Sequence, residues 1–271
     1  MEKVQIDGRV IVTGATGGIG AVVTRELAAQ GCSVIMACRN VAKAEAVREQ
    51  ILARVPQARI EVRPLDLTSL ASVRAFAEGL GPEPVGALFN NAGVISRGYS
   101  LTADGLENTF SVNYFGPFLL TKLLLPRLPA DARIVNMVSL TCRYVRADEQ
   151  ALRPAEKDFS QLGTYARSKL ALLHFSLELA RRHPELRVNL ADPGVVNSGI
   201  ISMGRWFDPL ADVLFRPFIK SPEKGAIPPL AALASEERLG YFVGNRRKEI
   251  PARYHDADLE RRLWNETERL I

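Results

Sequence analysis

Hydrophobic residues along this chain follow two spacings in turn. Short, largely β-branched runs predict buried strands, and apolar positions three or four residues apart predict helices. The first pair is the run Val10–Val12 and a helix with apolar positions from Ile19 to Leu27, which Gly31 caps. Further strands are predicted at residues 33–37, 60–62, 85–89, 133–139 and 187–191, with a short seventh at 240–243. Further helices are predicted at residues 44–55, 68–80, 106–125 and 164–183.

The order of these elements predicts the fold class. Strands and helices alternate, and the first four strands stand too far apart for hairpins, so we expect right-handed βαβ crossovers and a parallel sheet. No linker, repeat or low-complexity tract divides the chain. We therefore expect residues 1–271 to form a single doubly wound Rossmann-type α/β domain, whose seven-stranded, mainly parallel sheet has helices on both faces. Gly116-Pro117 interrupts the long helix predicted at 106–125.

Composition narrows the function classes. The chain is 47% hydrophobic and 24% charged, as ordinary soluble proteins are, and its net charge of +5 is scattered. Clusters such as Arg246–Lys248 and Arg261-Arg262 are interleaved with acids, so no nucleic-acid partner is expected. Cys32, Cys38 and Cys142 lack metal-ligand spacing, which predicts buried thiols in a reducing compartment and no metal site.

The same reasoning predicts a cytoplasmic protein. No apolar run approaches the roughly 18 residues of a membrane span, and the first strand begins too early for a signal peptide to precede it. Peripheral membrane contact stays open, as does the choice between a monomer and a homodimer.

The turn after the first strand predicts a phosphate site. Gly14, Gly17, Gly18 and Gly20 let the backbone approach a ligand closely, and the helix that follows presents its N-terminus to an anion. At the first strand of such a fold this suggests a dinucleotide pyrophosphate. The spacing is Gly14-x-x-x-Gly18-x-Gly20 rather than G-x-G-x-x-G, so a glycine-rich turn without a ligand is the alternative.

Other polar and glycine residues also follow strands. They are Cys38-Arg39, Asp66, Asn90 to Gly93, Ser139 and Pro193-Gly194. Because open parallel sheets bind ligands beyond the carboxyl ends of their strands, this clustering favours the cofactor site.

The second strand indicates which cofactor is preferred. NAD-dependent enzymes usually place Asp or Glu there, to bind the ribose 2′-hydroxyl. This chain has Cys38 and then Arg39, with Lys43 one turn later, and Arg can bind a 2′-phosphate through two parallel hydrogen bonds. We expect NADP(H) to be preferred over NAD(H), the alternative being a solvated Arg39.

A candidate reaction centre is Tyr165-Ala-Arg-Ser-Lys169. Residues i and i+4 lie on one helix face, so the lysine ammonium can stand near the phenol. At about 5 Å and an effective dielectric of roughly 20, it would favour the phenolate by about 3 kcal/mol, enough to bring a Tyr toward neutral pH. The pattern alone is common on helix surfaces, so its weight comes from the other motifs.

Together these motifs resemble the short-chain dehydrogenase/reductase family. The matching residues, in order, are Thr13-Gly14-x-x-x-Gly18-Ile19-Gly20, Asn90-Asn91-Ala92-Gly93, Asn113, Ser139, Tyr165-x-x-x-Lys169 and Pro193-Gly194. The resemblance implies an oxidoreductase in which Tyr165 donates or accepts the proton. It implies that Lys169 lowers the pKa of Tyr165 and holds the nicotinamide ribose, while Ser139 binds the substrate oxygen. Asn113 would help to complete a proton relay through water.

The resemblance also implies a cofactor contact at each strand end. Asp66 and Leu67 would meet the adenine, Asn90 to Gly93 the ribose side, and Gly194 and Val196 the nicotinamide. The full set of predicted cofactor residues is Gly14, Thr16, Gly17, Gly18, Ile19, Gly20, Arg39, Asn40, Asp66, Leu67, Asn90, Asn91, Ala92, Gly93, Tyr165, Lys169, Pro193, Gly194 and Val196.

Three features are similar to the retinol-dehydrogenase and WW-domain-oxidoreductase branch. They are Ala37-Cys38-Arg39-Asn40, the long interval from Ser139 to Tyr165, and the ending Arg262-Leu263-Trp264-Asn265-Glu266. Two positions depart from the family pattern. Val138 stands where a second Ser is frequent, and Asn197-Ser198 stands near the place of a Thr that binds the cofactor amide.

Residues 199–220 predict the substrate class. Trp206, Phe207 and Leu210 follow the nicotinamide-side loop, where a lid over an apolar substrate would belong. We expect a bulky hydrophobic aldehyde, ketone or alcohol, such as a retinoid, steroid or lipid. The alternatives are that these residues belong to the core or rest on a membrane surface.

Competing functions stay open at this point. One is an NADP(H)-binding sensor or scaffold without turnover, although such a protein need not keep Asn113, Ser139, Tyr165 and Lys169. Another is an extended epimerase or reductase, because Gly14-x-x-Gly17-x-x-Gly20 also satisfies that spacing, but too few residues follow Pro193 for its larger substrate domain. The histidines, His174, His183 and His255, show no Ser-His-Asp or metal spacing.

Overall fold

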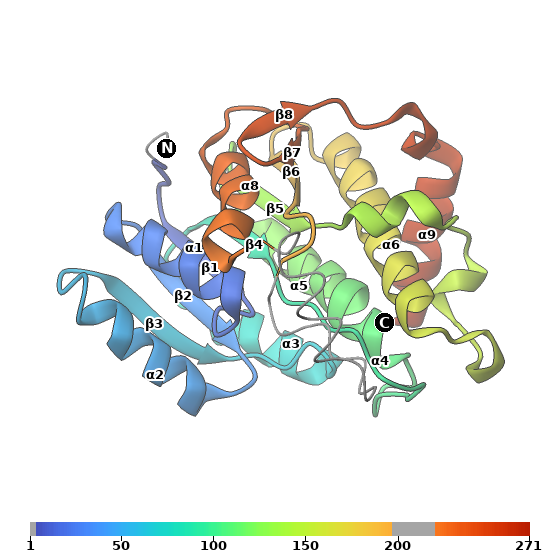
Figure 1. The fold of residues 1–271 in the computed structure, drawn as a ribbon, viewed down its shortest axis with the longest axis horizontal. Coiled ribbons are helices and arrows are strands. Elements are labelled where there is room, and N and C mark those ends of the chain that lie inside the picture. Colours follow the sequence, from blue (N-terminus) through green and yellow to red (C-terminus); the bar gives the residue numbers. More distant parts are fainter. Residues whose placement is uncertain (1–3, 197–219) are drawn as a thin grey trace.

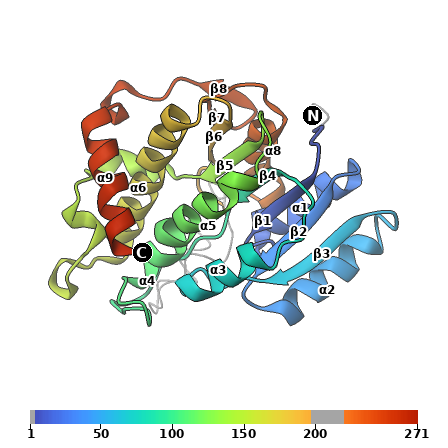
Figure 2. The same cartoon turned by 180° about the vertical axis from the view of Figure 1, so that it is seen from behind.

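A single continuous sheet organises the protein. The computed structural model describes residues 4–196 and 220–271, and its strands follow the order β3-β2-β1-β4-β5-β6-β7-β8 (Figures 1 and 2). The strands are β1 Arg9–Thr13, β2 Ser33–Cys38, β3 Arg59–Pro64, β4 Val85–Asn90, β5 Arg133–Met137, β6 Arg187–Asp192, β7 Tyr241–Val243 and β8 Arg246–Lys248. The first seven are parallel, as the sequence predicts, and the strand order reverses between β1 and β4. Ligands of such folds bind at that reversal.

The predicted number of strands is wrong by one within the described residues. β8 pairs antiparallel with β7, and the two-residue turn Gly244-Asn245 joins them. The sequence pattern missed β8 because Arg246, Arg247 and Lys248 are all exposed and carry no apolar alternation. Charged residues on an edge strand hinder pairing with another chain, which explains why this strand can be so polar.

Helices cover both faces of the sheet. The helices α1 Gly18–Ala29, α2 Val41–Leu52 and α8 Pro222–Ala234 lie on one face, and α3 Leu70–Glu78, α5 Gly116–Leu124 and α6 Gln161–Arg182 lie on the other (Figures 1 and 2). Side chains alternate along β1 to serve the two layers. Val10 and Val12 pack toward α1, whereas Ile11 packs toward α3 and α5.

The long helix predicted at 106–125 forms as a helical run with a change of pitch. It contains α4 Asn108–Phe110, a π-helical turn Ser111–Phe115 and α5, and a 3₁₀ turn follows it. Pro117 lies in the first turn of α5, where its missing N–H is tolerated, and the wider π turn precedes it. The Gly116-Pro117 interruption therefore alters the helix locally without ending it.

Two helices near the C-terminus have no counterpart in the sequence prediction. In α8 the paired prolines Pro228 and Pro229 obscured the helical pattern. The last helix, α9 Ala257–Leu270, lies against α6 and buries Leu263, Trp264 and Thr267. Trp264 joins Phe118 and Phe175 in what we call the aromatic cluster, with ring centroids 4.9–5.6 Å apart.

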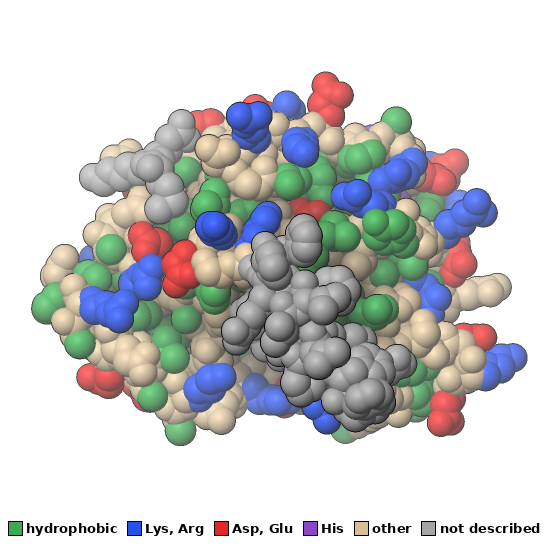
Figure 3. Space-filling model, viewed as in Figure 1, with side chains coloured by type: hydrophobic (Ala, Val, Ile, Leu, Met, Phe, Trp, Pro, Cys, Tyr) green, Lys and Arg blue, Asp and Glu red, His purple; other side chains and the backbone are tan. Residues whose placement is uncertain are grey.

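Two surface observations complete the fold. None of the described helices is long and apolar enough to cross a bilayer. On the face shown in Figure 3, Lys and Arg side chains are interspersed with Asp and Glu.

Candidate active site

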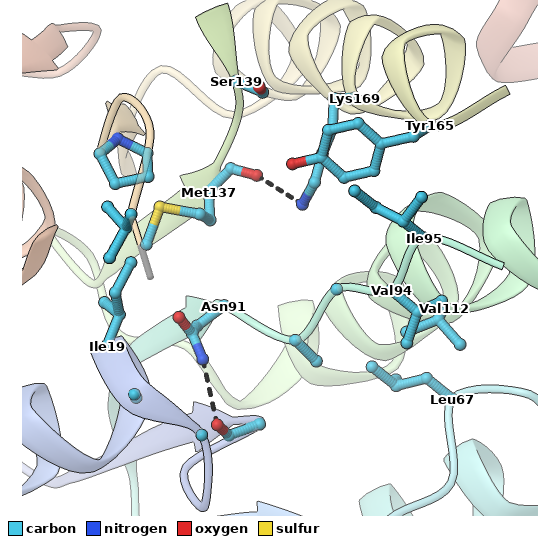
Figure 4. Close-up of a pocket in the computed structure, with 18 of the residues that line it drawn as sticks. Ile19, Leu67, Asn91, Val94, Ile95, Val112, Met137, Ser139, Tyr165 and Lys169 are labelled. Atoms are coloured by element: carbon cyan, nitrogen blue, oxygen red, sulfur yellow. Dashed lines mark hydrogen bonds between the residues drawn. The ribbon is translucent and has the colours of Figure 1, made fainter. Parts of the chain in front are cut away.

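A cavity of about 530 Å³ opens at the carboxyl ends of the strands. Its lining comes from the segments that follow β1 to β6, so residues far apart in the sequence meet there (Figure 4). The predicted site residues that line it are Gly14, Thr16, Gly17, Gly18, Ile19, Gly20, Arg39, Asn40, Asp66, Leu67, Asn91, Ala92, Gly93, Ser139, Tyr165, Lys169, Pro193, Gly194 and Val196.

Two predicted residues do not line the cavity. The side chain of Asn90 is buried and donates to Asn136 Oδ1 at 2.8 Å and to Thr121 Oγ1 at 3.2 Å. Asn90 is the last residue of β4, so its side chain and that of Asn91 point to opposite sides of the sheet. Asn113 is the other, and it lies behind the cavity wall. Trp206, Phe207 and Leu210, predicted to contact substrate, lie outside the described residues.

The glycine turn is shaped by close backbone contacts. Gly14 has φ of 64°, and a Cβ there would lie 2.9 Å from Ala92 Cα. A Cβ on Gly20 would lie 2.4 Å from the carbonyl oxygen of Gly14, so only glycine allows α1 to approach the turn. Helix α1 begins at Gly18 and no side chain caps it. Its first N–H groups are therefore available to an anion.

Asn91 and Thr13 join the ends of β1 and β4. Thr13 Oγ1 accepts the N–H groups of Asn91 and Ala92, both at 3.0 Å, and Asn91 Nδ2 donates to the carbonyl of Thr13 at 2.9 Å. These bonds hold the loop after β4 against the glycine turn, which keeps the floor of the cavity in one shape.

The end of β2 forms a basic rim. Arg39 and Lys43 are exposed, and neither forms an ion pair with any residue that the structure describes. Asn40 caps α2 by accepting the N–H of Lys43 at 2.8 Å. Cys38 is buried beneath the rim, and burial raises the pKa of its thiol although backbone hydrogen bonds from Ala15 and Thr16 oppose the rise. Two cations thus stand at the place where the sequence predicts a 2′-phosphate.

Lys169 and Tyr165 project from one face of α6 into the cavity (Figure 4). Lys169 Nζ donates to the carbonyl of Met137 at 2.8 Å, and burial lowers the pKa of this lysine to about 8. Met137 was not predicted, because a backbone carbonyl carries no signal in the residue type.

The pKa of Tyr165 differs from the prediction. Burial raises its pKa to about 12, and a hydrogen bond with Ser139 only partly opposes that rise. The sequence argument counted the attraction of the Lys169 ammonium but not the desolvation of the phenolate, which is larger here. In this structure Tyr165 is a neutral hydrogen-bond donor at neutral pH.

Asn113 connects the wall of the cavity to α6. Its Oδ1 accepts the N–H of Val94 at 2.8 Å, and its Nδ2 donates to Val94 O and Ser168 Oγ, both at 3.0 Å. Ser168 directly precedes Lys169, so Asn113 ties the loop after β4 to the helix that carries the lysine. The oxygen and the nitrogen of the side-chain amide thus both form hydrogen bonds in this connection.

Residues 8–203 match the family described as short chain dehydrogenase. This chain belongs to that family.

Curated relatives of this dehydrogenase resemble it over nearly its whole length. It is 39% identical to retinol dehydrogenase 12 of Homo sapiens over 97% of this chain and 86% of that protein. It is 40% identical to the polyprenol dehydrogenase of Mus musculus, over 97% of this chain and 84% of that protein. The WW domain-containing oxidoreductase of Danio rerio is 36% identical, over 98% of this chain and 68% of that protein. The chain is therefore a retinol-dehydrogenase-like oxidoreductase acting on alcohol or carbonyl groups.

Solved structures agree on the fold. An uncharacterized protein from Mycobacterium paratuberculosis superimposes with a TM-score of 0.79 at 33% identity, covering all of this chain and 97% of that one. A short-chain dehydrogenase from Sphingobium yanoikuyae in complex with NADPH gives a TM-score of 0.65 at 21% identity, over 86% of this chain and 87% of that one.

Much of the lining of the dehydrogenase's cavity is apolar. Among the apolar lining residues that the sequence analysis missed are Val94, Ile95, Val112, Leu140, Leu162 and Val195. Leu162 and Val195 are 53% and 44% exposed, which is high for large apolar side chains. For all but Val112, which lies in the π-helical turn, a place shortly after β4, β5 or β6 or at the start of α6 was the signal that could have found them. The lining of the cavity therefore combines a basic rim, Arg39 and Lys43, with several large apolar side chains.

Proposed function

We propose that this dehydrogenase transfers hydride between NADP(H) and a bulky hydrophobic alcohol or carbonyl compound, with Tyr165 as the acid and base. One observation carries the proposal: Tyr165 and Lys169 share a cavity whose lining combines the basic rim with large apolar side chains. A cofactor phosphate suits the basic rim, and an apolar substrate suits the apolar side chains.

The cavity residues match the chemistry of a nicotinamide dinucleotide. The uncapped N-terminus of α1 suits a pyrophosphate, and Arg39 with Lys43 suits a 2′-phosphate. Asp66 and Leu67 would hold the adenine, and Gly194 and Val196 would adjoin the nicotinamide. When bound, the nicotinamide supplies or accepts the hydride.

The chain's own residues would handle the proton. In carbonyl reduction, the substrate oxygen would accept the Tyr165 phenol proton and a hydrogen bond from Ser139 Oγ. The remaining phenolate would be stabilised by the Lys169 ammonium, which Met137 holds in place. In alcohol oxidation the same proton returns to Tyr165. Because burial opposes the phenolate in this structure, the positive charges of Lys169 and of an oxidised nicotinamide must supply the difference.

The substrate class is inferred from the apolar side chains of the lining and from relatives. Retinol and polyprenol, which two relatives are named for, are large apolar alcohols, and the side chains of Val94, Ile95 and Leu162 would accept such a chain.

A panel of aldehydes and ketones tests the activity. We expect NADPH to be oxidised faster with long apolar aldehydes than with small polar ones, and faster than NADH at equal concentration. A protein that binds NADPH but reduces no member of the panel would contradict the proposal.

The cofactor preference is tested by Arg39→Glu, with Arg54→Glu as the matched control. Arg54 is an exposed arginine just beyond α2 and outside the cavity. Losing a cation and gaining an anion beside the 2′-phosphate should weaken NADPH relative to NADH by about tenfold or more. The control should leave the ratio unchanged, and an unchanged ratio in Arg39→Glu would refute the role of Arg39.

A sensor that binds NADP(H) without turnover is the second candidate. One observation favours it: burial raises the pKa of Tyr165, which disfavours the phenolate that alcohol oxidation requires. Inactivity across the panel, together with tight NADPH binding, would select this candidate.

A further inference from the structure

The last residue of β6, Asp192, is a buried carboxylate directly before the turn that lines the cavity. It is 2% exposed. Its Oδ1 accepts the N–H of Gly194 at 2.8 Å, and its Oδ2 accepts the hydroxyl of Tyr241 at 2.8 Å. No ion pair reaches Asp192 from the residues that the structure describes. Both oxygens are thus used, and the carboxylate is held in one position without a neutralising partner.

The position of Asp192 relates it to the catalytic pair. Its neighbour Ala191 lies opposite Met137 in the sheet, and the carbonyl of Met137 accepts the Lys169 ammonium. The N–H of Val138 donates to the carbonyl of Ala191 at 2.9 Å. Asp192 therefore ends the strand that pairs with β5. The end of β5 carries the carbonyl that binds Lys169 and leads directly to Ser139.

Asp192 also shapes the turn itself. Gly194 has φ of 72°, and the hydrogen bond from its N–H to Asp192 closes the turn in that conformation. On the other side of the turn, Lys220 Nζ donates to the carbonyl of Pro193 at 3.1 Å. The turn thus lies between a buried anion and a partly exposed cation.

Several titratable groups lie near Tyr165, and their charges affect its ionisation differently. Lys169 lies one turn along α6, and its positive charge favours the phenolate form of Tyr165. Cys142 and Asp192 both act against the phenolate, but burial raises the pKa of the Cys142 thiol to about 12, so it is uncharged over the working range. Tyr241, on β7, is also neutral, because burial and Asp192 raise its pKa. Asp192 is therefore the standing negative charge among the described groups that act on Tyr165.

We propose that Asp192 is a positioning residue whose buried negative charge, behind the Pro193-Gly194 turn, makes the site bind oxidised cofactor in preference to reduced cofactor. The inference rests on the proposed function, which places the nicotinamide beside this turn. An oxidised nicotinamide ring is positively charged and a reduced one is neutral, so a fixed anion nearby discriminates between them. The same anion opposes ionisation of Tyr165 and so sets the pH at which alcohol oxidation begins.

Asp192→Asn tests the charge while keeping the shape. The amide oxygen can still accept the N–H of Gly194, so the turn persists. We expect the dissociation constant of NADP⁺ to rise about three- to tenfold relative to that of NADPH, measured by direct binding. We also expect the pH profile of kcat/KM for alcohol oxidation to move down by about one pH unit, the effect of a unit charge roughly 10 Å away at an effective dielectric of about 20.

Tyr241→Phe is the matched control. It removes the hydroxyl that donates to Asp192 Oδ2 but leaves the negative charge, so the ratio of the two dissociation constants should stay within about twofold of the parent. If Tyr241→Phe changed the ratio as much as Asp192→Asn does, the hydrogen bond rather than the charge would be responsible, and the proposal would fail.

A folded Asp192→Asn protein with the parent's dissociation-constant ratio also overturns the proposal. Asp192→Ser provides a second neutral variant with an oxygen that can accept from Gly194, and the same shift is expected. Failure of both neutral variants to fold would assign Asp192 a purely structural role, which again overturns it. Because binding is measured without turnover, a parent protein that binds both cofactor forms but reduces nothing counts against the proposed function alone.

Discussion

Helix α6 passes through two regions in which burial has opposite effects on stability. Its first half carries Tyr165 and Lys169 into the cavity, where an ammonium is buried against a single carbonyl. About 9 Å beyond Lys169 along the helix axis, Phe175 packs in the aromatic cluster with Phe118 and Trp264. There the guanidinium of Arg182 lies 4.4 Å from the Trp264 ring centroid and keeps contact with solvent.

The two halves of α6 therefore contribute differently: one half adds to the stability of the fold, and the other lines the cavity. In the aromatic cluster, apolar rings gain both burial and ring contacts, so the region holds α9 against the body of the protein. In the cavity, burial disfavours the charged form of Lys169 and raises the pKa values of Tyr165 and Cys142, so burial there lowers stability and changes how these groups titrate. Substitutions in the two halves should therefore affect different measurements.

The largest effect is expected from Tyr165→Phe. Loss of the only proton donor placed with Lys169 on this helix face should lower kcat/KM by about 10³-fold, or roughly 4 kcal/mol of transition-state stabilisation. The dissociation constant of NADPH and the free energy of unfolding should stay near the parent values. Steady-state kinetics and urea denaturation on the same preparation measure both, and substantial residual turnover would remove Tyr165 from the mechanism.

Trp264→Ala should show the opposite pattern. Removing this ring from the aromatic cluster leaves a cavity between α5, α6 and α9, which should lower the free energy of unfolding by about 3–5 kcal/mol. Cofactor affinity should change less than about twofold while the protein is folded. Asn265→Ala, at the exposed neighbouring position, is the control and should have little effect. A loss of NADPH affinity as large as the loss of stability would show that the two halves of α6 are coupled.

Lys169→Met should stabilise the protein at neutral pH while abolishing activity. The pKa of Lys169 is about 8 when folded and 10.5 as its reference value, so the folded state opposes its protonation. That unfavourable contribution is fully present below pH 8 and disappears as the pH rises toward 10.5. We expect the variant to exceed the parent by about 1–3 kcal/mol at pH 7, the lost bond to Met137 offsetting part of the gain, and by less near pH 10. Denaturant titrations at the two pH values check this, and a difference independent of pH would contradict it.

The smallest effect is expected at His174, which lies between the two halves. Burial lowers its pKa to about 4 from 6.5, and its Nδ1 has no hydrogen-bond partner among the residues that the structure describes. Because the folded pKa is lowered, this histidine contributes stability above pH 6.5 that is lost as the pH falls toward 4. His174→Gln should therefore remove up to about 2 kcal/mol of the acid-induced loss of stability. Denaturant titrations at neutral pH and near pH 4 check this, and a variant with the parent's full loss of stability in acid would contradict it.

Several site residues could be predicted because their chemistry is carried by residue type and spacing. Gly14 and Gly20 are required by backbone contacts that no other residue allows, and Tyr165 with Lys169 share a face by helical period alone. Asn90 shows the limit of that reasoning. It sits in a predicted motif, yet the alternation of β4 turns its side chain into a buried network with Asn136.

Other features depended on contacts between distant parts of the chain. Strand β8 has no apolar pattern and exists because a two-residue turn returns it to β7. Asp192 carries no motif of its own, and its place behind the cavity follows only from the pairing of β6 with β5 and β7.

The sequence by itself determined the alternating α/β order, the parallel sheet, the glycine turn and the placement of Tyr165 and Lys169 on one helix face, because each is encoded by local periodicity or by residue types that few other roles require. Only the tertiary structure decided how much water each group keeps. That is why Tyr165 has Lys169 as its predicted neighbour but a raised pKa instead of the predicted lowered one. Desolvation depends on everything packed around a side chain, and no local pattern of residues records it.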